Sequence, residues 1–189
     1  MLERVIIAGF GGQGVIFLGK LIAQACMHEG RNVTYFPAYG PEVRGGKANC
    51  HVVVSSDEIF SPVVAAADTL VVMNQPSWDY FLPRLKPDGL AVVNASLIAP
   101  AGQGDGQALV PVPATDVAKQ LGDVRAANMV MLGAHNHVRR LVSVDALLAG
   151  LRAALGDRKA GLFDLNRQAV HKGIEAAETA LAASDQPSP

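Results

Sequence analysis

Residues 5 to 15 read Val5-Ile6-Ile7-Ala8-Gly9-Phe10-Gly11-Gly12-Gln13-Gly14-Val15. An apolar run leads directly into a glycine-rich loop, and residues 15–28 after it carry apolar side chains at helical spacing. A strand, a glycine loop and a helix in this order are typical of α/β domains that present backbone N–H groups to an anion. We therefore expect an anion-facing helix start here, with Gly11, Gly12, Gln13 and Gly14 as its candidate contacts.

The same loop satisfies only half of the fingerprint of dinucleotide-binding domains. Gly9, Gly11 and Gly14 match the G-x-G-x-x-G pattern. The other half is a carboxylate about 20 residues further on, at the end of the next strand. The expected second strand ends Tyr35-Phe36-Pro37-Ala38 without a carboxylate, and Glu29 lies before it, at its wrong end. The alternatives at this point are binding of NAD or FAD, a tight turn without a ligand, and contact with another anionic ligand.

Strand and helix patterns alternate over the first two-thirds of the chain, and helices dominate the last third. This order predicts an α/β fold with a mostly parallel twisted sheet, helices on both faces in a Rossmann-like three-layer arrangement, and a helix-rich C-terminal third. Residues 1–183 are expected to form a single domain and 184–189 a disordered tail. The expected strands are 5–8, 33–36, 48–54, 69–73, 89–94 and 109–112, and the expected helices are 15–28, 76–85, 113–121, 128–141, 144–155 and 165–182.

Individual residues set several expected boundaries. Pro37 should end the second strand, and residues 87–89 should form the turn before the fifth. Ser143 and Asn128 are expected to be the N-caps of the helices that follow them. Gly133 should allow close helix packing. A role of Asn128 in the functional site is the alternative to its role as a cap.

Composition limits the classes of partner. Apolar residues make up 50% of the chain, charged residues only 17%, and the net charge is −1. Neither a nucleic acid nor an anionic membrane surface is an expected partner. No run of 18 apolar residues and no signal peptide is seen, so we expect a cytoplasmic protein without a membrane span. The apolar excess fits a compact α/β core, a surface covered by partner subunits, or both.

Residues for metal or catalytic chemistry are few. The two cysteines, Cys26 and Cys50, are too few for an iron–sulfur site, so clusters of any associated redox enzyme must lie on other chains. His135 and His137 would point to different sides of a helix and cannot form an i, i+4 metal pair. We expect no metal site and no complete catalytic set on this chain.

A second unusual loop follows the second strand, over residues 38–46. It contains three glycines, a proline and an acid–base pair, Glu42 and Arg44. Loops at the carboxyl ends of parallel strands share one edge, so this loop should face the same crevice as Gly11–Gly14. Arg44 is suited to hold a phosphate or a carboxylate. The alternative is a surface pair of Arg44 with Glu42 in an ordered turn.

These segments together resemble the gamma subunits of 2-oxoacid:acceptor oxidoreductases, which oxidise 2-oxoacids to acyl-CoA with thiamine diphosphate and iron–sulfur clusters. The resemblance covers residues 3 to 180 and includes Ser56-Asp57-Glu58-Ile59, Ser61-Pro62, Asn128-Met129 and Asn166. The version Tyr39-Gly40-Pro41-Glu42 is most similar to gamma subunits of the 2-oxoglutarate type. The specific segment is Tyr39-Gly40-Pro41-Glu42-Val43-Arg44-Gly45-Gly46-Lys47-Ala48-Asn49-Cys50, and the less specific one is Gly9 to Val15.

The resemblance implies a subunit equivalent to the third domain of single-chain pyruvate:ferredoxin oxidoreductases. Alpha and beta subunits would hold thiamine diphosphate and Mg²⁺. Beta and ferredoxin-like delta subunits would hold the [4Fe-4S] clusters. A further subunit would hold FAD if NAD is the electron acceptor. This chain would hold no cofactor alone and would help to form the coenzyme A pocket beside the thiamine site.

The contacts implied for coenzyme A are the glycine loop, Gly11, Gly12, Gln13 and Gly14, and the second loop, Glu42, Val43, Arg44 and Gly45, supported by Tyr39 and Asn128. Single-chain relatives carry basic residues where this chain has Glu42 and Val43, so Arg44 is the remaining cation of that loop. The alternative functions are a free-standing NAD(P)-binding reductase module and a pure scaffold subunit.

Overall fold

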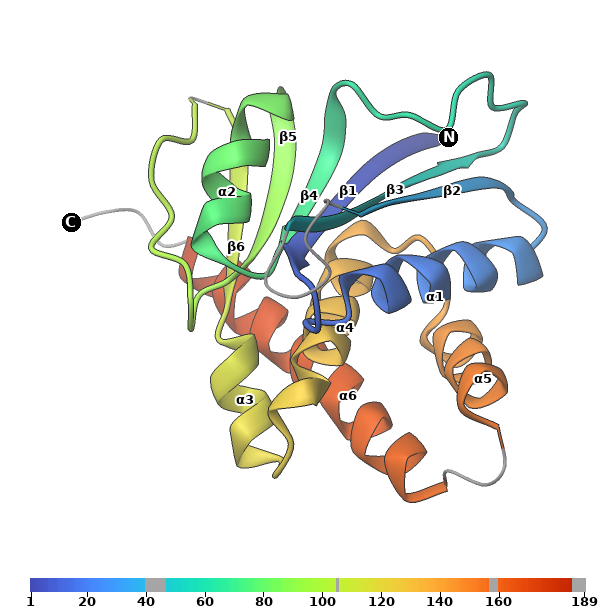
Figure 1. Cartoon of the computed structure of the whole chain (residues 1–189), viewed down its shortest axis with the longest axis vertical. Coiled ribbons are helices and arrows are strands. Elements are labelled where there is room, and N and C mark those ends of the chain that lie inside the picture. Colours follow the sequence, from blue (N-terminus) through green and yellow to red (C-terminus); the bar gives the residue numbers. More distant parts are fainter. Residues whose placement is uncertain (40–46, 105, 157–159, 185–189) are drawn as a thin grey trace.

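The chain forms a mixed sheet of six strands with helices on both faces (Figure 1). The computed structural model describes residues 1–39, 47–104, 106–156 and 160–184. The elements are β1 (Leu2–Phe10), α1 (Val15–His28), β2 (Asn32–Tyr39), β3 (Lys47–Ser55), β4 (Ala67–Val72), α2 (Gln75–Phe81), η1 (Leu82–Arg84), β5 (Leu85–Asn94), β6 (Ala108–Val112), α3 (Ala114–Gln120), η2 (Val124–Ala126), α4 (Ala127–Arg139), α5 (Val144–Leu155) and α6 (Ala160–Ser184).

The strand order is β2-β3-β1-β4-β5-β6. The strands β1, β4, β5 and β6 pair in parallel, whereas β3 is antiparallel to both of its neighbours, β1 and β2. The expected α/β class with a mostly parallel sheet is therefore confirmed, with β3 as the reversed strand. Because β3 is reversed, it begins at the sheet edge where the other strands end.

The two faces of the sheet are covered unequally. Alternate side chains of β1 enter different cores, with Val5 and Ile7 on one face and Ile6 and Ala8 on the other. The first face packs against α1, α4, α5 and α6, which Figure 1 shows gathered on one side of the sheet. The second face packs against α2 through the buried side chains of Trp78 and Phe81. The helix-rich last third of the chain therefore forms one thick layer.

Two strand boundaries expected at prolines are wrong. Pro37 does not end β2, which runs on to Tyr39. It is tolerated because β2 is an edge strand, where a missing N–H costs no hydrogen bond of the ladder. The expected turn at 87–89 lies within β5, whose pairing with β4 shifts register between the pairs Ala67–Leu85 and Thr69–Leu90. β5 begins at Leu85, earlier than expected, because it pairs with β4 on both sides of this irregularity.

Several expected helices agree closely with the structure. α1 and α5 have the predicted bounds, and the Ser143 hydroxyl accepts a hydrogen bond from the Ala146 N–H as the N-cap of α5. Residues 185–189 of the predicted tail lie outside the described residues. Within the described ranges, no helix is both long enough and apolar enough to cross a membrane.

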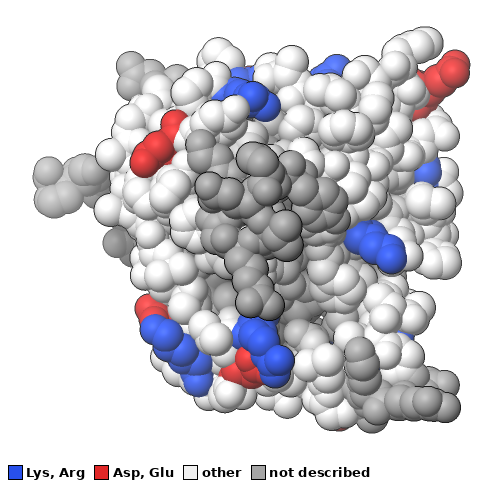
Figure 2. All heavy atoms as spheres, in the orientation of Figure 1, with Lys and Arg blue, Asp and Glu red and all other residues white. Residues whose placement is uncertain are grey.

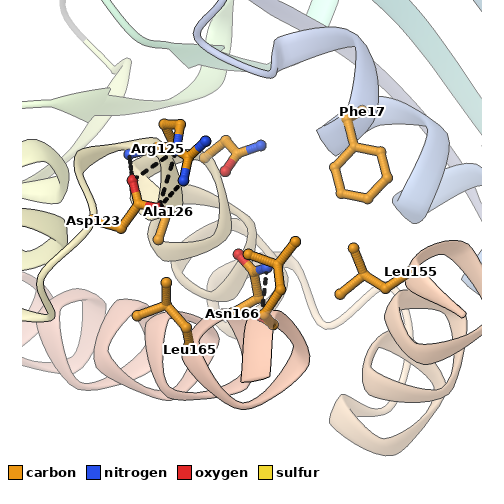
Figure 3. Close-up of a pocket in the computed structure, with 9 residues that line it drawn as sticks. Phe17, Asp123, Arg125, Ala126, Leu155, Leu165 and Asn166 are labelled. Carbon is orange, nitrogen blue, oxygen red and sulfur yellow. Dashed lines mark hydrogen bonds and ion pairs between the residues drawn. The ribbon is translucent and has the colours of Figure 1, made fainter. Parts of the chain in front are cut away.

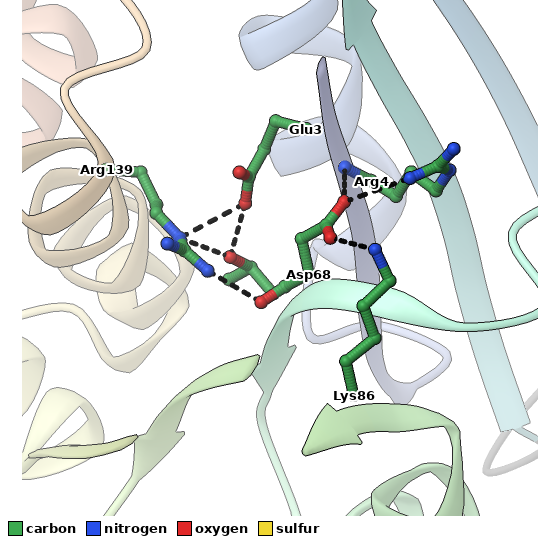
Figure 4. Close-up of polar contacts among 6 residues, drawn as sticks. Glu3, Arg4, Asp68, Lys86 and Arg139 are labelled. Atoms are coloured by element: carbon green, nitrogen blue, oxygen red, sulfur yellow. Dashed lines mark hydrogen bonds and ion pairs between the residues drawn. The ribbon is translucent and has the colours of Figure 1, made fainter. Parts of the chain in front are cut away.

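Charged side chains are sparse on one face of the molecule. Figure 2 shows one face of the molecule, on which lysine, arginine and acidic side chains are scattered over a mostly uncharged surface. A partly buried polar network lies at the end of the strands opposite the glycine loop (Figure 4). There Arg139 of α4 donates to the Thr69 hydroxyl (2.6 Å) and the Asp68 carbonyl (2.6 Å), and its Nε lies 3.1 Å from the Glu3 carboxylate. Asp68 also pairs with Lys86 and Arg4.

The helices α4 and α6 cross with their backbones in contact. A Cβ atom added to Gly133 would lie 2.0 Å from the Val170 carbonyl oxygen, and one added to Gly173 would lie 1.9 Å from the Val130 carbonyl oxygen. Real Cβ atoms do not approach so closely, and the neighbour here is rigid backbone. The expectation that Gly133 allows close packing is confirmed, and Gly173 is its counterpart on α6.

We expect Gly133→Ala to destabilise the protein by about 3 kcal/mol, because the two helices must move apart. The free energy of unfolding from urea titrations measures this loss. Gly150→Ala on α5 is the control, since nothing lies within 4 Å of its added Cβ. That variant should gain about 1 kcal/mol from helix propensity. Equal effects of the two substitutions would contradict the packing argument.

His135 lies within α4 and is 1% exposed. Neither ring nitrogen has a hydrogen-bond partner among the described residues. Burial, helped by the charge of Arg139, lowers the pKa of His135 to about 3. The unfolded chain therefore binds one more proton than the native protein between about pH 3 and the ordinary histidine pKa of about 6.5, and stability falls as pH falls through this range.

We expect His135→Leu to remove this loss of stability at low pH. The stability difference between the variant and the natural protein should grow in favour of the variant by about 2 kcal/mol between pH 7 and pH 5, at about 1.4 kcal/mol per pH unit below 6.5. Urea unfolding at both pH values measures it. Parallel pH profiles of the two proteins would show that His135 is not buried as a neutral side chain.

Candidate functional site

The candidate site lies at the edge of the sheet where β1, β2, β4, β5 and β6 end and β3 begins. Phe10, the last residue of β1, is paired with Lys47, the first of β3. Tyr39, the last residue of β2, is paired with Ala48. The glycine loop therefore lies at the same edge as the described residues that flank the second loop. Glu42, Val43, Arg44 and Gly45 themselves lie outside the described residues.

The glycine loop leads into α1 without a side-chain cap. Gly12 has a φ of 98° and Gly14 a φ of 73°, conformations that favour glycine. Gly14 is the N-cap residue of α1 and, as a glycine, supplies no side-chain cap; in the described part of the chain no other side chain is recorded as accepting a hydrogen bond from the helix start. The first N–H groups of a helix, here those of residues 15–17, have no acceptor within the helix itself. The start of α1 is thus an electropositive backbone site.

Gln13 holds the loop in place from inside. Its Oε1 accepts hydrogen bonds from the Phe10 N–H (2.7 Å) and from the Asn74 side chain (2.7 Å), and its Nε2 lies 3.4 Å from the Met73 carbonyl oxygen. The side-chain amide of Gln13 therefore ties the end of β1 to the end of β4. The backbone of the loop, rather than this side chain, remains for a ligand.

Sequence reasoning missed a row of polar residues that continues this network along the edge. Asn74 follows β4 and caps α2 through the Ser77 N–H (3.0 Å). Asn94 ends β5 and donates to the Thr115 hydroxyl (2.8 Å) at the start of α3. An asparagine directly after a buried strand run is a signal that would have found both. These side chains satisfy buried backbone groups and fix the loops of the site.

Asn128 contacts the glycine loop instead of capping α4. The helix follows directly from η2, its N-cap position is Ala126, and no side chain caps it, so the expected N-cap role is wrong. The Asn128 Nδ2 donates to the Gly14 carbonyl oxygen at 3.3 Å. A Cβ on Gly14 would lie 2.2 Å from the same Nδ2. The structure thus brings Asn128 and Gly14 together, although they are far apart in sequence.

A cation that sequence reasoning did not single out lies beside the loop. Arg125 of η2 donates from Nε and Nη2 to the Asp123 carboxylate at 2.7–3.0 Å, while 82% of its side chain is exposed. These hydrogen bonds hold the pKa of Asp123 below its ordinary value. Arg125 lines two hollows. One, of about 160 Å³, also includes Gly12, Gln13 and Thr115. The other, of about 210 Å³, also includes Phe17, Asn128 and Asn166 (Figure 3).

The titratable groups in the core are not set up for catalysis. Burial raises the pKa of Cys26 to about 11 and that of Cys50 to about 12, so both thiols stay protonated. Burial lowers the pKa of His51, whose Nδ1 accepts a hydrogen bond from the Val64 N–H at 3.0 Å. Across the described ranges, no three His, Cys, Asp or Glu side chains are grouped to hold a metal ion.

Glu29, the carboxylate that precedes the second strand, binds to the start of α5. The Glu29 Oε1 accepts hydrogen bonds from the N–H and the hydroxyl of Ser143, each at 2.9 Å. Glu29 thereby joins the end of α1 to the start of α5. It lies at the opposite end of β2 from the position where a dinucleotide-binding domain has its ribose-binding carboxylate, so Glu29 does not take that role.

Comparisons with known sequences agree on one family. The family model described as pyruvate ferredoxin/flavodoxin oxidoreductase matches residues 4–176. The ketoisovalerate oxidoreductase subunit VorA of Methanothermobacter thermautotrophicus is 46% identical over 69% of this chain, which spans only 27% of that relative. The 2-oxoglutarate synthase subunit KorC of the same organism is 36% identical over 76% of this chain and 80% of the relative.

Solved structures give the same result. One match is a 2-oxoglutarate:ferredoxin oxidoreductase from Magnetococcus marinus, solved with 2-oxoglutarate, coenzyme A and succinyl-CoA bound. Its TM-score is 0.88 and its sequence identity 27%, and the match covers 94% of this chain and 31% of that longer chain. The gamma subunit of a keto/oxoacid ferredoxin oxidoreductase from Geobacter sulfurreducens matches with a TM-score of 0.81 and 27% identity over 94% and 99% of the two chains. The resemblance found in the sequence is confirmed, and the chain belongs to the pyruvate ferredoxin/flavodoxin oxidoreductase family.

Proposed function

We propose that this chain is the gamma subunit of a 2-oxoacid oxidoreductase complex and helps to form its coenzyme A pocket beside the thiamine site. The observation that carries the proposal is the uncapped start of α1 after the glycine loop, which offers backbone N–H groups to a phosphate. The related enzyme from Magnetococcus marinus has coenzyme A bound, which supports the choice of this anion. The second loop, with Arg44, would supply further contacts at the same edge.

In the proposed complex, partner chains supply the chemistry. Thiamine diphosphate with Mg²⁺ on alpha and beta subunits would decarboxylate the 2-oxoacid, and [4Fe-4S] clusters on beta and delta subunits would carry the electrons to ferredoxin. The relatives of this chain belong to ketoisovalerate, 2-oxoglutarate, indolepyruvate and pyruvate enzymes. We therefore assign the choice of 2-oxoacid to the thiamine-binding partners. This chain contributes to assembly and to the site of the acyl acceptor.

The role of each described residue at the site follows from its contacts. Gly12 and Gly14 give the loop its backbone conformation, and Gln13 fixes it to the ends of β1 and β4. Asn128 holds the Gly14 carbonyl and so fixes the loop against α4. The N–H groups at the start of α1 would then meet a phosphate group without rearrangement, which is the condition for tight anion binding.

We expect Gly12→Asp to raise the KM of the assembled complex for coenzyme A about 10-fold relative to Gly12→Asn. Both substitutions carry a similar strain at this positive φ, which Asn and Asp adopt more often than most residues, and no described residue lies within 4 Å of the added Cβ, so the pair differs mainly in charge. A carboxylate placed where a phosphate binds costs about 1.4 kcal/mol, which corresponds to 10-fold. Steady-state kinetics with varied coenzyme A at saturating 2-oxoacid measures the ratio.

The difference between the two variants should shrink in high salt, because salt screens an exposed charge. Equal KM values for coenzyme A in two fully assembled variants would instead favour the pure scaffold function. Loss of assembly in both variants would also favour it, since the loop would then be a subunit contact.

A further inference from the structure

The second face of the sheet carries one helix of the described chain, α2, which packs over β1, β4 and β5. The connection from β3 to β4, residues 56–66, contains neither helix nor strand. Figure 1 shows α2 on one side of β4 and this connection on the other. In a doubly wound domain, helices cover both faces of the sheet. Here β2, β3 and the connection 56–66 have no helix over them on this face.

Large apolar side chains are exposed on this face. Val33 and Tyr35 of β2 pack into the core of the first face, so Phe36 points to the second. In the connection 56–66, Phe60 is 93% exposed, the highest value among the large apolar side chains of the described chain. Large exposed apolar patches mark sites of interaction. We call four exposed side chains of this face the apolar patch: Phe36, Phe60, Val63 and Tyr80.

The buried side chain of His51 connects the parts of the patch. Its Nδ1 accepts a hydrogen bond from the Val64 N–H at 3.0 Å, and its ring centre lies 6.2 Å from that of Phe36. Burial, helped by the charge of Arg84, lowers the pKa of His51, so Arg84 also lies near this ring. The strand β2, the connection 56–66 and the η1 turn after α2 therefore meet around one residue.

A cation lies at one end of the patch. The guanidinium carbon of Arg84 lies 5.5 Å from the ring centre of Tyr80 and 5.3 Å from that of Phe81. These contacts place the guanidinium over the rings. Within the described ranges, no carboxylate forms an ion pair with Arg84. Its charge therefore remains available to a group outside the chain.

An anion lies at the other end of the patch, next to Phe60. Asp57 and Glu58 are both exposed. The Asp57 carboxylate accepts a hydrogen bond from the Ser56 hydroxyl at 3.2 Å. Glu58 has no hydrogen-bond or ion-pair partner among the residues that the structure describes. One apolar surface thus carries an unpaired cation at one end and an unpaired anion at the other.

This charge pattern is complementary to itself. A two-fold axis places residue i of one copy against residue j of the other, and j against i, so each acidic end meets a basic end. Aromatic and arginine side chains are also the usual anchors of protein interfaces. Addition of a strand to the free edge of β2 is disfavoured by Pro37 in that edge. A contact through the face of the sheet remains.

We propose that a second copy of this chain docks on the apolar patch, with Glu58 and Phe60 of each copy against Arg84 and Tyr80 of the other. The inference goes beyond the proposed function and does not depend on coenzyme A. Sedimentation equilibrium of the full chain tests it. The natural chain should be a dimer at about 100 μM, a concentration that saturates a contact of micromolar affinity.

Phe60→Ser should raise the dissociation constant of the dimer by about 100-fold, because an anchor side chain is worth about tenfold or more and the symmetry repeats its loss. Its exposure means that the substitution leaves the fold unchanged. Met27→Ser is the matched control, since Met27 is 62% exposed but lies on α1, which packs on the first face. This variant should dimerise within 2-fold of the natural chain.

Charge reversal tests the pairing across the axis. Arg84→Glu and Glu58→Arg each place like charges against each other twice, so each variant alone should dimerise at least 10-fold more weakly. A mixture of the two variants should form a dimer again, because both contacts of the mixed pair then join opposite charges. A mixture that dimerises no better than its components overturns the inference.

Two further outcomes would overturn it. The first is a natural chain that stays monomeric at about 100 μM, or a dimer that Phe60→Ser does not weaken. The second is a monomeric chain whose entry into the oxidoreductase complex is blocked by Phe60→Ser and not by Met27→Ser, since the patch would then contact a different subunit. In the assembled complex, native mass spectrometry should find an even number of copies of this chain, and an odd number counts against the inference in the same way.

Discussion

The backbone contact between α4 and α6 is the constraint on which the helical layer depends. Gly133 and Gly173 let each helix place its backbone against a carbonyl of the other, at Val170 and Val130. Helices packed through side chains lie 8–10 Å apart, and a contact through glycine is closer and allows less sliding. Asn128 on α4 and Asn166 on α6 are therefore held at fixed positions, and both line the hollow beside the glycine loop.

The glycine loop is built by polar contacts that run inward. Its one polar side chain, Gln13, is bonded to the ends of β1 and β4, and Asn94 continues the network to α3. Each buried backbone group satisfied in this way saves the cost of an unpaired donor or acceptor. Because the N-cap residue of α1 is Gly14, which has no side chain, the start of the helix is formed by backbone. A site made of backbone depends on rigidity, and the inward contacts provide it.

Much of this fold follows from the sequence, because periodicity and capping are local. The bounds of α1 and α5 and the Ser143 cap were predictable from residues within one or two turns. Pro37 was misread because its tolerance depends on β2 being an edge strand, which is a property of the sheet. Asn128 was misread as a cap because its partner, Gly14, lies at the other end of the chain. The glycine loop was predictable as a local motif, whereas Arg125 and the hollow arise from tertiary packing.

The polar network around Arg139, at the end of the strands opposite the glycine loop, fixes the C-terminal end of α4. Burial is the main cause that raises the pKa of Glu3, so its pairing with Arg139 partly offsets a desolvation cost. The same guanidinium also donates to the Thr69 hydroxyl and the Asp68 carbonyl, and this geometry fixes both the rotation and the height of the helix. A hydrophobic side chain at position 139 would fill the space without fixing either.

Asn128 lies about 16 Å from Arg139 along the helix axis, at about 1.5 Å per residue. A slip of one residue would rotate the amide about 100° away from the Gly14 carbonyl. Arg139 is bound to β4 and to the start of β1, and Asn128 to the loop at the end of β1. The helix is therefore attached to both ends of the same strand, so the charged network that lies farthest from the site keeps the glycine loop and the hollow in register.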